Sequence, residues 1–327
     1  MNPETARRFR RLGTLTIFAV YFVILVGGIV RASGAGMGCP DWPTCFGQLI
    51  PPTSEAELPN NYHEIYAVGY SNTDFNVFKT WTEYLNRLTG VTIGILIFLT
   101  LWFSRAYLKT DKAVFYLSLA VFLLVGFQGW LGAVVVKTHL HPLMITAHML
   151  LALFIVALLI YAIARSQSEL LQQIDISHVP AIFKPALIVA MGFTLIQVGM
   201  GTQVREAVDL IATHHNYIDR EYWRDSFPLI FYIHRSFSAV ILFTNLWLAW
   251  KIIQSTDASS LLFRLAYALV GLIISAILAG VALDRLGVPP VAQPIHLLIA
   301  NLIFGIQFFI FICIRYAARD KTIPALP

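Results

Sequence analysis

The chain has 327 residues, of which 57% are hydrophobic and 13% are charged, and its mean hydropathy is +0.70. A soluble domain carries about a quarter charged residues, so a fully water-facing surface is excluded and a lipid bilayer is the expected solvent. The net charge of +5 does not indicate nucleic-acid binding, because the lysines and arginines lie in short loops between apolar runs.

Eight apolar runs of about twenty residues follow one another along the chain, and each can cross a hydrocarbon core about 30 Å thick. Only helices satisfy their own backbone in lipid at this segment length. We therefore predict an all-α integral membrane protein with eight transmembrane helices. The predicted spans are 12–31, 84–104, 113–136, 144–164, 181–203, 229–253, 262–283 and 294–315.

The basic residues predict the orientation of these spans. Four arginines between residues 7 and 11 precede the first span, which has the length of a membrane helix and not of a cleaved signal. Fourteen of the 23 lysines and arginines fall on the inner side if the N-terminus is cytoplasmic. We expect a bacterial inner-membrane protein with both termini in the cytoplasm and with external loops 32–82 and 204–228.

The chain also repeats itself. Motifs recur in the same order in its two halves, and the later pairs share one offset of 148 residues, which predicts a parallel repeat. We predict two pseudo-symmetric four-helix bundles, residues 1–170 and 171–327. The matched pairs are Gly27–Arg31 with Gly201–Arg205, Tyr84–Arg87 with Tyr232–Arg235, Gly132 with Gly280, and His148 with His296.

Three histidines, His148, His234 and His296, lie near the outer ends of apolar spans. Ionisable residues are costly in lipid and normally face a partner inside a bundle. One alternative is a hydrogen-bonded histidine that packs helices. Their matched depth favours haem, because imidazoles from two helices suit the two axial positions of a haem iron. Zinc typically needs four clustered ligands.

Four arginines stand near this layer and are candidates for binding haem propionates, since guanidinium pairs well with carboxylates. Arg31 and Arg205 end their predicted spans on the outside, where snorkelling to lipid headgroups is the alternative. Arg87 and Arg235 follow the layer residues directly, and bracing of the helix packing is their alternative role.

Glu83 lies at the same level, and Phe231 takes its place in the second half. A buried carboxylate beside a haem can carry a proton or stabilise a cationic intermediate. The alternative is a glutamate at the membrane interface that is exposed to solvent. Asn86 also lies in this layer, one helical turn from Glu83.

Two cysteines, Cys39 and Cys45, enclose a short external loop rich in proline. A disulfide between them would persist in an oxidising compartment. It would be either a structural staple or a dithiol that passes reducing equivalents, since exposed short-loop disulfides can be labile. We expect the remaining cysteine, Cys313, to pack among helices.

Together these residues resemble the haem A synthase family over nearly the whole chain, and the combination is more specific than any one motif. The resemblance rests on Val30–Cys45, Glu83–Arg87, Gly201–Arg205, His234–Arg235 and the helix starts at His148 and His296. It implies eight helices in two halves, and an enzyme that oxidises the C8 methyl group of haem O to the formyl group of haem A.

The resemblance also implies residue roles. His234 and His296 would hold a haem B iron, while Glu83 and His148 would serve the substrate haem O in the first half. Cys39 and Cys45 match the cysteine pair of one subgroup. Expected partners are haem O and the haem O synthase that supplies it, with a homo-oligomer also compatible; the sequence identifies no electron donor.

One position departs from the family, whose other histidine in the first half falls on Asn86. Asparagine is a poor iron ligand but a good hydrogen-bond donor and acceptor. Either His148 alone binds the substrate iron and leaves one face open, or the departure marks a member with lost or altered activity.

Rival functions follow from these features. A non-catalytic haem B cytochrome or haem carrier of the same fold is the main alternative to a haem A synthase. A transporter is suggested by the repeat, but the histidine layer lies near one face and not at the midplane. Haem farnesylation is disfavoured because the aspartate-rich pair needed for magnesium diphosphate is missing from the sequence.

Overall fold

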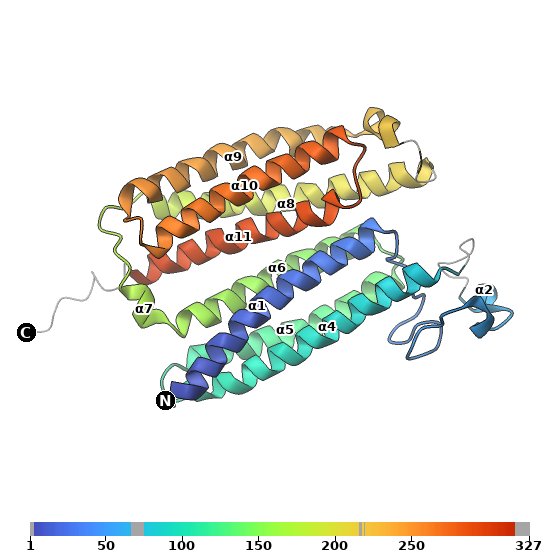
Figure 1. Cartoon of the computed structure of the whole chain (residues 1–327), viewed down its shortest axis with the longest axis horizontal. Coiled ribbons are helices and arrows are strands. Elements are labelled where there is room, and N and C mark those ends of the chain that lie inside the picture. The colour runs from blue at the N-terminus through green and yellow to red at the C-terminus, as the bar shows by residue number, and fades with distance from the viewer. Residues whose placement is uncertain (1–2, 67–74, 216–217, 219, 318–327) are drawn as a thin grey trace, which may run out of the picture.

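The computed structural model describes residues 3–66, 75–215, 218 and 220–317, and these are nearly all helical (Figure 1). Eight of its helices are long and apolar enough to span a membrane, which confirms the predicted all-α integral membrane fold. They are α1 (Pro3–Ala32), α4 (Val77–Ser104), α5 (Lys112–Lys137), α6 (Pro142–Arg165), α8 (Phe183–His214), α9 (Leu229–Ser255), α10 (Leu261–Arg285) and α11 (Ala292–Ala317).

The helix ends follow local capping chemistry. The side chains of Asn76, Asp111 and Ser260 each accept a hydrogen bond from a backbone N–H in the first turn of α4, α5 and α10. Short elements fill the connections: η1 (Glu55–Glu57), α2 (Tyr62–Ile65), η2 (Arg105–Tyr107), α7 (Ser168–Gln172) and η3 (Arg220–Ser226).

Three predicted boundaries are wrong: α1 begins at Pro3 and not at residue 12, α4 begins at Val77 and not at residue 84, and α8 ends beyond residue 203. The apolar run predicts that the fifth span ends at residue 203, whereas α8 continues to His214. This extension carries Glu206 and Asp209, whose charges end the hydrophobic pattern although the backbone remains helical. The predicted loop 204–228 is therefore helical in its first part, and Arg205 lies within the helix.

The helices form two neighbouring groups. Helices α1, α4, α5 and α6 pack on one another, as do α8, α9, α10 and α11, and the groups meet mainly where α11 contacts α1 and α6. Figure 1 shows the second group above the first, and one continuous apolar core runs through both. This arrangement is consistent with two four-helix bundles, while the division at residue 170 stays a prediction.

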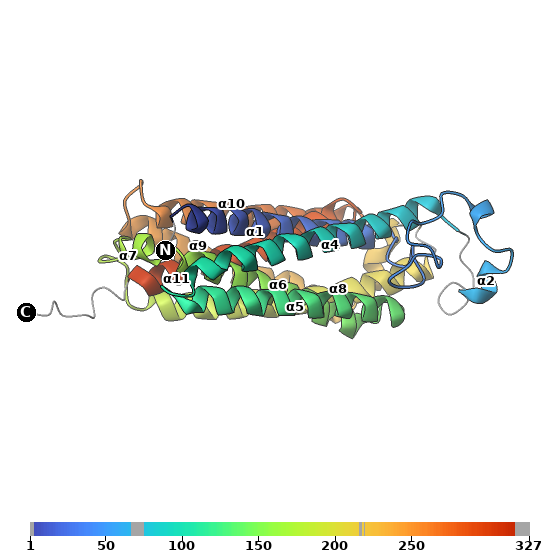
Figure 2. The ribbon, with the colours of Figure 1, turned by 90° about the horizontal axis from the view of Figure 1, so that it is seen from below.

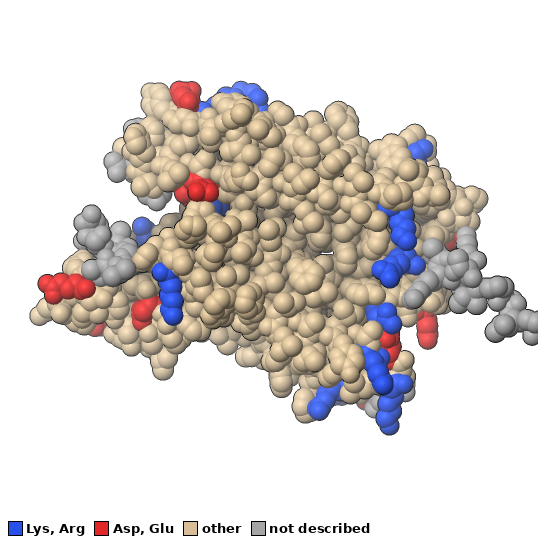
Figure 3. All heavy atoms as spheres, turned by 180° about the vertical axis from the view of Figure 1, so that it is seen from behind, with Lys and Arg blue, Asp and Glu red and all other residues tan. Residues whose placement is uncertain are grey.

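The two ends of the molecule differ. The start of α1 and the end of α11 lie at one end, and the loop that follows α1 projects beyond the helices at the other (Figure 2). We call this second end the loop end. In Figure 3 an uncharged band separates the ends, and lysine and arginine gather near the end where α1 starts. A cytoplasmic location for the termini agrees with this pattern and stays a prediction.

The close contact between α1 and α11 requires a residue without a side chain at Gly305. A Cβ atom at this position would lie 2.0 Å from the Tyr21 hydroxyl oxygen. Gly305→Ala should therefore destabilise the protein by about 1–3 kcal/mol through overpacking, measured by thermal unfolding in detergent. Gly192→Ala is the control, because no atom lies within 4 Å of its Cβ position; equal melting temperatures for the two variants would contradict the packing.

Candidate functional site

A large cavity lies toward the loop end and is walled by both helix groups. Its volume is about 2200 Å³, well above the 300–1,000 Å³ or so of a typical small-molecule pocket. All nine candidate residues outside the cysteine loop line it: Arg31, Glu83, Asn86, Arg87, His148, Arg205, His234, Arg235 and His296. The helix packing thus brings together residues that are far apart in the sequence.

Two histidines face each other in the second half. His234 on α9 and His296 on α11 have ring centroids 6.5 Å apart, with ring planes inclined at 74°. A Cβ at Gly201 would lie 3.4 Å from the His234 ring, and one at Gly280 would lie 3.5 Å from the His296 ring. Each imidazole therefore lies directly over a glycine, where a longer side chain would collide with it.

In the first half only one of the two contacts between a histidine ring and a glycine is present. A Cβ at Gly132 would lie 3.5 Å from the His148 ring, the same relation as that of Gly280 to His296. Asn86 occupies the position equivalent to His234, and no atom lies within 4 Å of the Cβ position of Gly27, the counterpart of Gly201. The shorter asparagine leaves open the space that an imidazole fills in the second half.

The histidine helices are also tied to the preceding helices. Gln128 Nε2 donates to the backbone oxygen of His148 at 2.9 Å, and Gln197 Nε2 donates to that of His234 at 3.1 Å. Among the described residues, the Nδ1 atoms of His148, His234 and His296 make no hydrogen bond of standard geometry although they are buried.

Glu83 is 3% exposed, and both of its carboxylate oxygens are engaged. One accepts from the backbone N–H of Cys39 at 2.6 Å, and the other pairs with Arg87 Nη2 at 2.6 Å. The interfacial, solvent-exposed glutamate is therefore excluded. A buried charge is stable only when it is paired and hydrogen-bonded, and Glu83 meets both conditions.

Arg87 fastens the cysteine loop to α4. Its guanidinium donates to the backbone oxygens of Asp41, Thr44 and Cys39 at 2.8, 2.9 and 3.2 Å. These bonds and the Glu83 pair use both terminal nitrogens of Arg87. The geometry favours the bracing role over propionate binding for this arginine, with the loop rather than another helix as its partner.

The predicted disulfide between Cys39 and Cys45 is present, with Cα atoms 4.8 Å apart. Its loop lies against the start of α4, and a Cβ at Gly38 would lie 2.2 Å from the backbone oxygen of Lys79. Trp42 and Pro43 of the same loop line the cavity, so the disulfide loop forms part of its roof. Cys313 is buried among helices, as expected.

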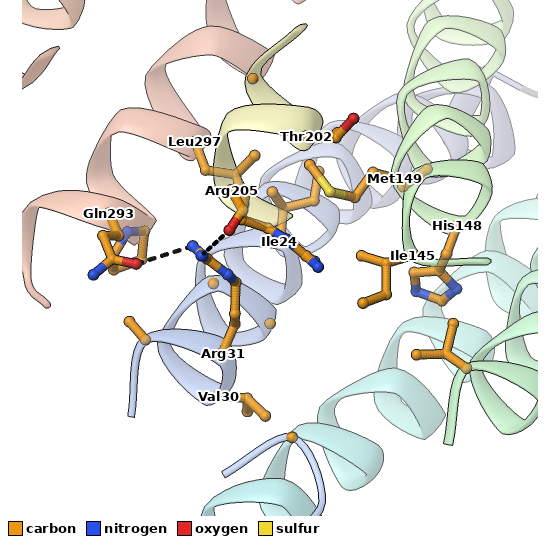
Figure 4. A pocket seen from close by; sticks show the side chains of 18 of the residues that line it. Ile24, Val30, Arg31, Ile145, His148, Met149, Thr202, Arg205, Gln293 and Leu297 are labelled. Carbon is orange, nitrogen blue, oxygen red and sulfur yellow. Dashed lines mark hydrogen bonds between the residues drawn. The ribbon is translucent and has the colours of Figure 1, made fainter. Parts of the chain in front are cut away.

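Arg31 and Arg205 meet between the helix groups. Arg31 donates to Gln293 Oε1 at 2.9 Å and pairs with Asp209 at 2.7 Å, while Arg205 approaches Asp209 at 3.5 Å. Figure 4 shows Arg31 between Gln293 and Arg205, with His148 on the other side of the cavity. The Nε atoms of both arginines have no hydrogen-bond partner among the described residues.

Arg235 is the counterpart of Arg87 but is placed differently. It is 48% exposed and reaches the Asp284 carboxylate at 3.4 Å. Asp284 and Asp209 both line the cavity and were not predicted as site residues. Asp209 follows Arg205 by one helical turn, so the i,i+4 spacing would have indicated it had the longer helix been recognised.

The fold and the cavity define a polytopic membrane protein with matched histidine positions in its two helix groups. Residues 10–308 match the COX15-CtaA family, described as cytochrome oxidase assembly protein. This match covers most of the chain, which therefore belongs to that family.

Several relatives carry the name heme A synthase. The protein of Shewanella oneidensis is 33% identical over 163 residues, which are 50% of this chain and 47% of the relative. That of Nitrosospira multiformis is 30% identical over 151 residues, 42% of each chain. That of Ehrlichia canis is 29% identical over 153 residues, 43% of this chain and 44% of the relative. The chain spans about half the length of these relatives.

The role of Arg87 is testable by comparison with Arg235. Arg87→Ala removes four hydrogen bonds, three of them to the cysteine loop, and leaves the Glu83 carboxylate without its cation. We expect limited proteolysis to cleave residues 39–45 at least about tenfold faster, because local opening becomes more frequent. Arg235→Ala should leave this rate unchanged; equal rates in the two variants would contradict the bracing role.

Proposed function

We propose that this protein makes haem A by oxidising the C8 methyl group of haem O to a formyl group, a four-electron oxidation for which molecular oxygen is the external oxidant and oxygen source. Relatives that share the family are named heme A synthase. The observation that carries the proposal is the pair of imidazoles 6.5 Å apart, together with a first half that keeps one of these histidines and adds a buried carboxylate.

The second half fits a haem B. Two imidazoles that bind opposite sides of one metal ion at about 2 Å place their ring centroids about 6 Å apart. The described residues contain no group of three or more His, Cys, Asp or Glu side chains able to hold a bare metal ion. His234 and His296 would thus hold the iron, and the glycines beneath them would keep the rings in place. When bound, this haem supplies electron transfer.

The first half would take the substrate. His148, over Gly132, would hold haem O on one face, and the Asn86 amide would face the other side. The Glu83 carboxylate would accept a proton after one of its two hydrogen bonds is released. Because these bonds come from Cys39 and Arg87, the position of the disulfide loop would control when that carboxylate is free.

Arg31 and Arg205 are proposed to pair with haem propionates. Both line the cavity and both have an unpaired Nε atom, and Arg205 approaches Asp209 only at 3.5 Å. A propionate would replace this weak contact with a charge-assisted pair. In the same proposal, the protein works in a bacterial inner membrane with cytoplasmic termini and receives haem O from a haem O synthase.

A non-catalytic haem B cytochrome or haem carrier is the second candidate. Asn86 in place of a histidine, and a Glu83 carboxylate already engaged by the loop, are the observations that favour it. This candidate shares the haem B site but requires no proton transfer at Glu83.

The haem B assignment predicts distinct spectra for matched variants. His234→Ala or His296→Ala should abolish the low-spin absorption spectrum of the purified protein, because either change removes an axial ligand. His148→Ala should retain it, since that ring belongs to the other half. A low-spin spectrum that survives both second-half changes would contradict the assignment.

The enzyme and the non-catalytic protein differ in their dependence on Glu83. General acid–base catalysis contributes about 10²–10⁴-fold, so Glu83→Gln should lower haem A formation by about a hundredfold or more. Chromatography of haems extracted from cells supplied with haem O measures this. Glu57→Gln, in the external loop, should have no effect. Normal haem A in the Glu83→Gln strain would favour the non-catalytic protein.

A further inference from the structure

Four glycines of the first half line the cavity beside empty space. Gly90 and Gly94 lie on α4, and Gly126 and Gly129 lie on the neighbouring α5. At each of the four, no described atom outside the surrounding turns of the same helix's backbone lies within 4 Å of the position that a Cβ would occupy. We call this part of the cavity the glycine groove.

The repeat shows that the groove belongs to one half only. At the same offset of 148 residues, the second half carries Ser238, Leu242, Ile274 and Ile277. The cavity-lining glycines of the second half are Gly201 and Gly280, and a histidine ring covers each of them. At these four positions the first half therefore has only the glycine hydrogen atoms, where the second half has three bulky apolar side chains and a serine.

Close helix packing does not explain these glycines. Gly90 and Gly94 have the spacing of a small-residue helix contact, in which backbones approach closely. Such a contact would bring neighbouring atoms to the Cβ positions, whereas the described residues of this chain leave them empty. Three explanations remain for the empty space: a ligand in the groove, a second copy of the chain, or the acyl chains of the bilayer.

The groove extends away from His148 and has apolar walls, as a site for an apolar chain requires. At about 1.5 Å per residue, it runs about 9 Å from Gly132, under the His148 ring, to Gly126, away from the loop end. Val91 and Leu123 also line the cavity and are more than half exposed. The groove therefore begins at the histidine and continues, away from the loop end, along exposed apolar side chains.

A polar group marks the upper part of the groove. Gln128 lies between Gly126 and Gly129, and its Oε1 atom is buried without a hydrogen-bond partner, while its Nε2 donates to the His148 backbone. The second half has Ala276 at the position that the 148-residue offset gives, and its own unpaired glutamine, Gln197, lies on α8 instead. An unpaired buried acceptor is costly, and a ligand hydroxyl near the histidine level would satisfy it.

We propose that the glycine groove holds the isoprenoid chain of haem O and selects this haem over haem B. This inference rests on the proposed function. The two haems differ in one substituent, a hydroxyl-bearing isoprenoid chain in haem O and a vinyl group in haem B. The groove provides length and apolar walls for the chain, and Gln128 Oε1 accepts the hydrogen bond of its hydroxyl. The second half, which lacks the glycine groove, takes the haem without the chain.

The test fills the groove with the side chains that the second half itself uses. Haem O or haem B is titrated into full-length protein whose His234–His296 site already holds haem B, and binding is followed by absorption. The wild type should bind haem O at least about tenfold more tightly than haem B. In the double variant Gly94→Leu/Gly126→Ile the ratio of the two dissociation constants should fall to about one, with haem B affinity unchanged.

The control variant is Gly271→Leu. This glycine also has an empty Cβ position but does not line the cavity, so the wild-type preference should persist. Gln128→Ala should weaken the binding of haem O more than that of haem B. Gln197→Ala removes the similar hydrogen bond to the His234 backbone and should not change the preference for haem O.

Two results would contradict the role of the groove but not the proposed function: a wild type that binds both haems equally, or a double variant that keeps the preference for haem O. A retained preference accompanied by a changed mass in light scattering would assign the glycines to a contact between copies of the chain. A wild type that binds neither haem in its first half would overturn the proposed function as well.

Discussion

An imidazole inside a membrane helix needs a defined partner, because lipid offers it neither water nor a counter-charge. The rest of this structure is arranged around that constraint. His148, His234 and His296 each lie over a glycine of a neighbouring helix and face one shared cavity. The second half places two such rings 6.5 Å apart, and the first half places one ring opposite an asparagine.

The same constraint explains why the two halves differ where they do. A carboxylate in the first half is stable at Glu83 only because Arg87 of α4 and the backbone of Cys39 hold it. Cys39 belongs to the disulfide loop, and the second half has only one cysteine, Cys313, so it has no such loop. The disulfide loop therefore has two functions in the structure: it roofs the cavity and it supplies a hydrogen bond to a buried charge. Loss of the loop would leave Glu83 partly unpaired.

Much of the fold could be predicted because hydropathy and length decide it. The eight spans, the disulfide and the family follow from the sequence, and the histidine layer follows from the repeat. The end of α8 was missed because Glu206 and Asp209 interrupt the apolar pattern without ending the helix, and the Asp209 contacts with Arg31 and Arg205 were missed with it. The contacts of Arg87 depend on the path of a loop around Gly38, which no helical periodicity encodes. The glycine groove appears only when equivalent positions of the two halves are compared in three dimensions.

The central proposal is that His234 and His296 would together hold one haem iron. Electron paramagnetic resonance of the oxidised, purified protein tests it most directly, because the signal reports both the spin state and the angle between two axial imidazoles. With ring planes inclined at 74°, the account predicts a strongly anisotropic low-spin ferric signal that disappears in His296→Ala. A protein that shows only high-spin iron, or that retains no haem after haem is supplied, would contradict it.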